Sequence, residues 1–193
     1  MTATDEPGLP VHTVVARPVT AEAFAPFGRL IVAEGERRPI DMYGDRINVY
    51  KGGPIDADVP VEFLISRSSV REFRVRFLER HFKLAQTFMA LQGSSFVVAV
   101  ARPEARLEHD VPALDEIHAY IIPGYAAATI HRGTWHEPPY PLTNDQIRIT
   151  TTHAELTQGL ERGIDAQGDI PGLDVDKREL TPRTGVVVRI GLP

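Results

Sequence analysis

Apolar and polar residues alternate in short runs along most of the chain after residue 60. Stretches that contain Gly, Pro, Asp or Asn, which are the usual residues of turns, separate these runs. Alternation with a period of two predicts β-strands, and short strands at this spacing are typical of an antiparallel barrel or sandwich. The predicted strands cover residues 61–66, 72–80, 86–92, 95–101, 117–122, 126–131 and 146–152.

The segments outside these runs predict one short helix and several peripheral strands. Thr20 is a good N-cap for a helix that Pro26 and Gly28 would end. The last apolar run is predicted to be an added strand or a partner contact. The peripheral strands are expected at residues 28–33, 46–50 and 185–190.

The chain is predicted to form a single domain over residues 1–193. Its 193 residues, of which 42% are hydrophobic, suffice for one core. Residues 1–10 are small and polar and are expected to be disordered. The stretch 157–184 is polar and rich in Gly, which predicts loops with at most one helical turn.

The strand that begins near Phe73 ends in two polar side chains. Alternate residues of a strand point the same way, so Phe73, Val75 and Phe77 should share a face with Glu79 and His81. An apolar face that ends in a carboxylate and an imidazole predicts a barrel interior that becomes polar at its mouth. Ligand and catalytic sites are commonly built in such places.

Two further polar residues are predicted to face the same interior. Gln86 shares parity with Phe88 in the next strand, and His136 follows a glycine turn beside the only tryptophan, Trp135. One buried His or Gln alone is usually a hydrogen-bonded core group, but several inward polar groups are costly to bury without a function. The candidate catalytic set is therefore Glu79, His81, Gln86 and His136.

Other basic residues and histidines are candidates for binding and for support. Arg132 and Arg148 flank the predicted pocket and could bind a carboxylate. His153 shares parity with Ile147 and Ile149, which makes it a second candidate for the interior. A run of arginines is expected on a solvated or subunit-contact face: Arg71, Arg74, Arg76 and Arg80.

Composition and missing motifs narrow the range of functions. The net charge of −5 argues against a nucleic-acid surface, and the lack of cysteine excludes disulfides, thiol nucleophiles and cysteine-ligated metals. The sequence has no run of 18 apolar residues and no signal pattern, so we expect a cytoplasmic protein without a membrane contact. It also lacks the phosphate-loop motif and the Gly-x-Ser-x-Gly hydrolase elbow.

The spacing of the polar residues resembles the two motifs of the cupin superfamily. The first cupin motif runs His-x-His, three or four residues, Glu, six residues, Gly. Here Glu79-x-His81, Gln86 and Gly93 occupy the same frame, and a second block ends in His136. The resemblance implies a cupin-like double-stranded β-helix, or jelly-roll barrel, with a short N-terminal helix and extra peripheral strands.

A narrower resemblance points to one family within that superfamily. The blocks that start at Glu79 and at His131, with the early Ala23-Phe-Ala-Pro-Phe-Gly28, are similar to the ureidoglycolate lyase family over about residues 14–153. The segment after the last core strand departs from the family pattern, because Thr152-His153-Ala154-Glu155 stands there, followed by a longer tail.

That resemblance implies cleavage of the carbon–nitrogen bond of ureidoglycolate to glyoxylate and urea, in allantoin and purine degradation. The elimination needs a base for the substrate hydroxyl and an acid for the leaving nitrogen. His136 or His81 would be the base, and Glu79 and Gln86 would orient the reacting groups. Substrate binding is assigned to His131, Arg132, Trp135 and Arg148.

Two questions stay open at the level of sequence. His81, His136, Glu79 and Gln86 could hold a divalent ion such as nickel, manganese or zinc, or could act by acid–base chemistry alone. The scaffold could also serve another small hydroxy- or oxo-acid enzyme, or a non-catalytic module that binds a small acid. A small anionic substrate and a homodimer are the expected partners.

Overall fold

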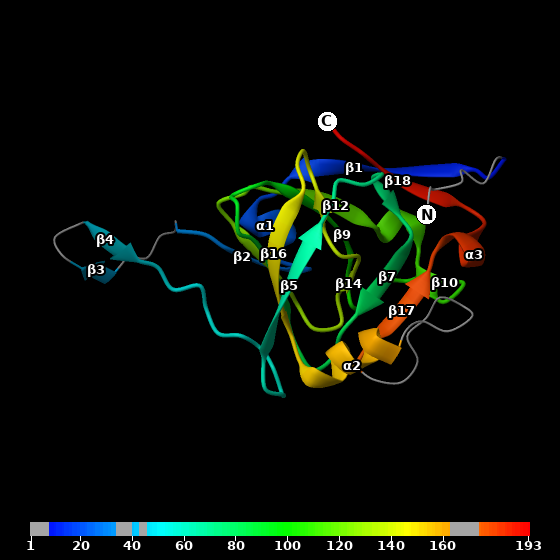
Figure 1. Ribbon diagram of the computed structural model, residues 1–193. Helices are drawn as coiled ribbons and strands as arrows, with labels where there is room; N and C mark the ends of the chain where they lie inside the picture. The colour runs from blue at the N-terminus through cyan, green and yellow to red at the C-terminus, as the bar shows by residue number, and fades with distance from the viewer. Residues whose placement is uncertain (1–7, 34–39, 43–45, 163–173) are drawn as a thin grey trace.

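The computed structural model describes residues 8–33, 40–42, 46–162 and 174–193, and these fold into a mainly β structure. Disorder is expected from the sequence over residues 1–10, of which residues 1–7 lie outside the described part of the chain and residues 8–10 lead directly into β1. Two large sheets face each other, and short helices and hairpins lie at the periphery (Figure 1). The mainly β, two-sheet architecture expected from the sequence is confirmed.

The larger sheet has nine strands and carries most of the candidate site. Its order is β17-β7-β14-β9-β12-β1-β18-β6, with β15 pairing with β9. The bounds are β1 (Val11–Pro18), β6 (Arg74–Val75), β7 (Phe77–Arg80), β9 (Phe96–Ala101), β12 (His118–Ile122), β14 (Trp135–His136), β15 (Tyr140–Pro141), β17 (Asp176–Glu179) and β18 (Val187–Gly191).

The second sheet has five strands in the order β2-β13-β8-β16-β5. Its strands are β2 (Gly28–Ile31), β5 (Glu62–Ser68), β8 (Gln86–Ala90), β13 (Ala127–Ile130) and β16 (Gln146–Thr152). Two small hairpins complete the strands, and the first projects away from the body of the molecule (Figure 1). They are β3 (Ile40–Met42) with β4 (Ile47–Val49), and β10 (Leu107–Glu108) with β11 (Val111–Pro112).

The helices are short and follow local sequence signals. The hydroxyl of Thr20 accepts a hydrogen bond from the Ala23 amide at 3.1 Å, which caps α1 as the sequence predicts. Within the described residues, no helix is long and apolar enough to span a membrane. The cytoplasmic location expected from the sequence stays a prediction. The helices are α1 (Ala21–Phe24), the 3₁₀ helix η1 (Leu114–Glu116), α2 (Ala154–Arg162) and α3 (Thr181–Thr184).

Strand β9 lies between two hydrophobic cores because all six of its residues are buried. One face, with Phe96 and Val98, packs against Phe88 of the second sheet and forms the interior of the barrel. The opposite face, with Val97 and Ala99, packs in a core behind the sheet. Strands β6, β1 and β18, at the far end of the same sheet, also line that second core.

The run predicted as one strand over 72–80 is broken in two. Val75 belongs to β6, which pairs with β18, whereas Glu79 belongs to β7, which pairs with β14 and β17. The break at Arg76 shifts the alternation by one residue. Val75 therefore packs with Leu78 in the rear core, and the predicted face shared by Val75 and Glu79 is wrong.

The predicted arginine surface and the last apolar run make contacts inside the chain. Arg71 lies over the Tyr140 ring at 3.9 Å, and Arg80 lies over Trp135 at 4.1 Å while pairing with Asp176 at 2.8 Å. The final run forms β18, which pairs with β1 on one side and β6 on the other. Of the two roles predicted for this run, an added strand or a partner contact, the structure shows the added strand.

Candidate active site

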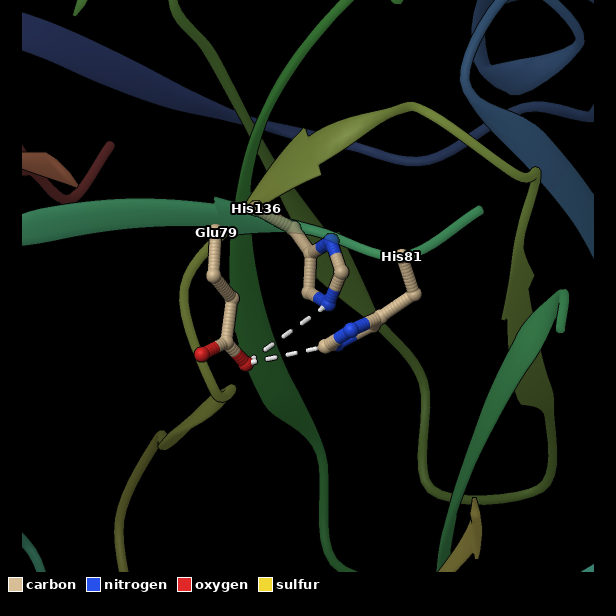
Figure 2. Close-up of side chains that lie close together, drawn as sticks. All are labelled: Glu79, His81 and His136. Carbon is tan, nitrogen blue, oxygen red and sulfur yellow. Dashed lines mark ion pairs between the residues drawn. The ribbon is translucent and has the colours of Figure 1, made fainter. Parts of the chain in front are cut away.

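Two neighbouring strands of the large sheet bring the central residues together. His136 of β14 is directly opposite Glu79 of β7 in the antiparallel ladder, and His81 immediately follows Arg80, the last residue of β7. Their side chains point toward one another inside the barrel (Figure 2). The pairing of β7 with β14 thus joins residues that lie more than fifty positions apart in the sequence.

A glycine turn holds the two histidine-bearing loops in contact. Gly133 has a φ of +75°, a left-handed conformation that favours glycine, and its N–H donates to the His81 carbonyl at 2.7 Å. The turn leads into β14, where the side chains of Trp135 and His136 point to opposite faces of the sheet. His136 packs against Phe88 in the barrel interior, at 5.9 Å between ring centroids.

The Glu79 carboxylate lies between the two imidazoles. Its Oε1 is 3.7 Å from Nε2 of His81 and 3.9 Å from Nε2 of His136 (Figure 2). The imidazole rings are 5.2 Å apart between centroids. All three side chains are buried, so they interact in a medium that screens charge weakly.

Backbone carbonyls fix the tautomer of both rings. Nδ1 of His81 lies 3.1 Å from the carbonyl oxygen of Asp174, and Nδ1 of His136 lies 2.9 Å from that of Thr134. A carbonyl only accepts hydrogen bonds, so each Nδ1 carries a proton. Both Nε2 atoms are therefore left facing the Glu79 carboxylate.

The surroundings push the pKa values of the two histidines apart. Burial, and then the charge of His81, lowers the pKa of His136 to about 4. Burial also acts to lower the pKa of His81, but the Glu79 carboxylate, 3.7 Å from Nε2, outweighs it and raises that pKa. Burial acts to raise the pKa of Glu79, but His81, His136 and Lys177 hold it below its usual value. A neutral His136 therefore stands beside an ionic His81–Glu79 pair.

Gln86 joins the cluster from the opposite sheet. Its amide oxygen lies 3.0 Å from Nε2 of His136 at the start of β8. A neutral His136 with its proton on Nδ1 accepts a hydrogen bond at Nε2. The NH₂ group of Gln86 would donate that bond if the amide group were rotated by 180°. A doubly protonated ring would donate to the amide oxygen instead. Gln86 can therefore satisfy both protonation states of His136.

The same three side chains have the geometry of a metal centre. One ligand atom each from Glu79, His81 and His136 lies within 4.8 Å of the others. Nε2 of His81 is buried without a hydrogen-bond partner, although every other ring nitrogen in the cluster has one. Imidazoles whose Nδ1 donates to a carbonyl are the usual form of metal-bound histidine.

The residues expected to bind substrate are not all in this cluster. Trp135 is buried on the other face of β14, and His131 is exposed. The Arg132 guanidinium pairs with Asp56 and Asp58 on the surface. The assignment of these three residues to the substrate stays a prediction.

Arg148 is buried in the structure but lies away from the histidines. It pairs with Ala90 in the ladder, which places it about 13 Å along β8 from Gln86. Its guanidinium donates to the carbonyl oxygen of Pro139 at 3.1 Å and to the amide oxygen of Gln146 at 3.2 Å. Both partners are neutral, and no ion pair to Arg148 occurs among the described residues.

His153 and Asp174 support the site, which the strand pattern could not reveal. His153 was expected inside because it shares parity with Ile149, yet Ile149 lies opposite the exposed Met89 and Ile65. His153 stands just beyond the end of β16 and is buried by a different contact, with Asp174 at 2.9 Å. Asp174 lies in the long polar tail, where no periodicity marks it.

Comparisons with known proteins give a consistent result. Residues 11–163 match the model of the ureidoglycolate lyase family. The ureidoglycolate lyase of Pseudomonas paraeruginosa is 34% identical over 133 residues, which are 66% of this chain and 76% of that protein. That of Pseudomonas fluorescens is 31% identical over 66% of this chain and 77% of its own length.

One solved structure shows a slight similarity. RmlC from Streptococcus suis, solved in complex with dTDP-D-xylose, aligns with a TM-score of 0.32 and 10% identity. The alignment covers 58% of this chain and 55% of that one. A likeness this slight supports no conclusion.

Proposed function

This chain belongs to the ureidoglycolate lyase family, and we propose that it cleaves ureidoglycolate into glyoxylate and urea. The observation that carries the proposal is the convergence of His136, His81 and Glu79 at one buried point. Family membership indicates the reaction, and these residues supply the acid and base groups that it needs. The reaction belongs to allantoin and purine degradation.

The two imidazoles suit opposite proton transfers. The substrate carbon carries a hydroxyl, a carboxylate and a ureido nitrogen. Nε2 of neutral His136 would take the hydroxyl proton, and the oxygen lone pair would form the aldehyde C=O as the carbon–nitrogen bond breaks. His81, held protonated by Glu79, would give its Nε2 proton to the leaving nitrogen, which releases urea.

A divalent ion at the same residues is the alternative to these direct proton transfers, because it would occupy the Nε2 atoms that carry them. His81 and His136 would bind it through Nε2, Glu79 would bind through a carboxylate oxygen, and Gln86 would lie beside them. Such an ion would supply Lewis-acid chemistry toward the hydroxyl or carboxylate of the substrate. Nickel, manganese and zinc all accept this mixture of nitrogen and oxygen ligands.

Metal analysis tests this part of the proposal. In the metal-bound alternative, the purified protein contains a near-stoichiometric divalent ion, and a chelator lowers its thermal stability as well as its turnover. The double variant His81→Ala/His136→Ala is the matched control and should lose both responses. Full activity after thorough chelation, unchanged by added nickel, manganese or zinc, would remove the metal from the mechanism.

Arg148 is the buried cation among the expected substrate-binding residues, although it lies away from the histidines. It is the one of the four that combines burial with a charge paired only to neutral oxygens. A buried guanidinium of this kind favours a carboxylate ligand. His131, Arg132 and Trp135 remain proposals that rest on the sequence alone.

A panel of small hydroxy and oxo acids tests the choice of substrate. Glyoxylate release from ureidoglycolate supports the proposal. Turnover of another acid, but not of ureidoglycolate, would instead indicate a different enzyme on the same scaffold. A rise in melting temperature with an acid, without turnover of any, would indicate a binding module.

We also propose a homodimer that forms through the outer face of the five-stranded sheet. Phe63 and Ile65 of β5 are 68% and 73% exposed, and Met89 and Leu91 are also exposed. Ile149 of β16 is opposite Ile65 on one side and Met89 on the other, so the apolar row crosses three strands. Contiguous apolar patches on a sheet face favour contact with a second, symmetry-related copy.

A further inference from the structure

Asp174 is the hub of the contacts that hold the loop after β7. Its carbonyl accepts from Nδ1 of His81 at 3.1 Å. Its carboxylate accepts from the Phe82 amide at 2.8 Å and from the Lys83 amide at 2.9 Å. One residue therefore binds three successive positions of this loop, from His81 to Lys83.

The carboxylate is itself held from the far side. Nε2 of His153 donates to its Oδ2 at 2.9 Å, and both side chains are almost fully buried. His153 immediately precedes α2, whose Glu155 pairs with the side chain of Lys83. The loop that carries His81 is thus fixed between α2 and the strand β17 that follows Asp174 (Figure 1).

Asp174 and β17 lie beyond the matched family region, which ends at residue 163, whereas His153 and Glu155 lie within it. Strand β17 pairs with β7 so that Lys177 is opposite Glu79. The C-terminal segment therefore contacts two of the three central residues, His81 through Asp174 and Glu79 through β17.

We propose that Asp174, supported by His153, is a positioning residue that keeps the Nδ1–H of His81 on the Asp174 carbonyl, so that Nε2 stays aimed at the reacting centre. The inference rests on the proposed function of His81. The carboxylate makes no contact with Glu79 or His136 among the described hydrogen bonds and ion pairs, so it acts through the loop. With the carboxylate removed, the Asp174 carbonyl would lose its fixed place and the His81 ring could rotate or change tautomer.

Substitution of Asp174 tests the proposal by kinetics and by spectroscopy. We expect Asp174→Ala to lower kcat about 10- to 100-fold, with a much smaller change in KM, because the ring is misplaced while the rest of the site is intact. Long-range ¹H–¹⁵N spectra of histidine-labelled protein, recorded at a pH where the His81 ring is neutral, should show the ring protonated at Nδ1 in the wild type and a mixture of tautomers in the variant. Asp174→Asn, which keeps one accepting oxygen, should lie between the two.

Controls separate positioning from loss of fold. Glu108→Gln removes a surface ion pair with Arg106, away from the loop of His81, and should leave kcat and the His81 signals unchanged. If Asp174→Ala does not fold, His153→Ala removes one donor to the carboxylate and should cause the same changes to a smaller degree.

Folded Asp174 and His153 variants with a wild-type kcat and an unchanged His81 tautomer would overturn the proposal. Wild-type protein that does not turn over ureidoglycolate would instead overturn the proposed function. The tautomer spectra would still decide the role of Asp174 in that case.

Discussion

At the scale of single residues, the two central histidines differ because of their neighbours. His81 faces the Glu79 carboxylate and has no other partner at Nε2, whereas His136 is desolvated and contacts the Gln86 amide. The same side chain can therefore act as an acid in one position and as a base in the other. This difference leads to two predictions.

Removal of either imidazole should abolish most turnover. We expect His136→Ala and His81→Ala each to lower kcat about 10²- to 10⁴-fold, which is the usual effect of losing a positioned acid or base. Circular dichroism should show that both variants keep the fold. His109→Asn, at an exposed position outside the site, is the control and should keep wild-type rates. Folded variants of His81 and His136 with near-normal rates would refute the proton-transfer roles.

The pH dependence of kcat/KM should report the two pKa shifts. His136 must be neutral to act as a base, so activity should fall only as the pH approaches its pKa of about 4. His81 must be protonated to act as an acid, so activity should fall on the alkaline side, above the ordinary value of 6.5. A single acid limb near 6.5 would show that His136 is not desolvated as the structure indicates.

Most of the central cluster could be predicted from the sequence, whereas its supporting residues could not. Glu79, His81 and His136 stand at short, motif-like spacings beside apolar residues, and Gln86 begins a strand. Asp174 has no such context, since its contacts depend on a chain reversal more than ninety residues after His81. Burial by a distant segment leaves no periodic trace in the local sequence.

At the scale of elements, strand pairing determines both the site and the free surface. Strand β7 is covered on both edges, by β14 and by β17, which holds Glu79 in place. The five-stranded sheet instead has an outer face whose apolar row includes Ile65 and Met89. The pairing of β7 on both edges stabilises the candidate active site, and the apolar outer face favours contact with a second copy of the chain.

A charge on the outer sheet face should break the homodimer. We expect Ile65→Glu to convert a dimer into a monomer in sedimentation velocity, because burial of an unpaired carboxylate in an apolar interface is costly. Leu107→Glu, an exposed apolar position on β10, should leave the dimer intact. Wild-type protein that is monomeric at high concentration would contradict the proposed interface.

Strands with clear alternation could be predicted, and those formed by tertiary contact could not. The run at residues 146–152 became β16 with the same bounds. Strand β17 reads Asp-Lys-Arg-Glu, which has no apolar face, and it is a strand because β7 offers it an open edge. Strand β1 pairs in parallel with β12 and β18, which no local pattern reveals.

At the scale of the whole molecule, strands near both ends of the described chain complete the fold. Strands β1 and β18 extend the large sheet beyond β12 and line its rear core, while Asp174 and β17 enclose the loop of His81. The expected jelly-roll barrel accounts for the interior that the two sheets share. It does not account for this outer layer, because the resemblance ended near residue 153.

The central claim is that the buried Glu79, His81 and His136 cluster eliminates urea from ureidoglycolate. The most direct test is to measure glyoxylate and urea together as the wild-type protein reacts with ureidoglycolate, beside His136→Ala. Equal amounts of both products, at a rate that rises with enzyme concentration and collapses in the variant, are the predicted result. Ammonia in place of urea, or no glyoxylate from the folded wild-type protein, would contradict the claim.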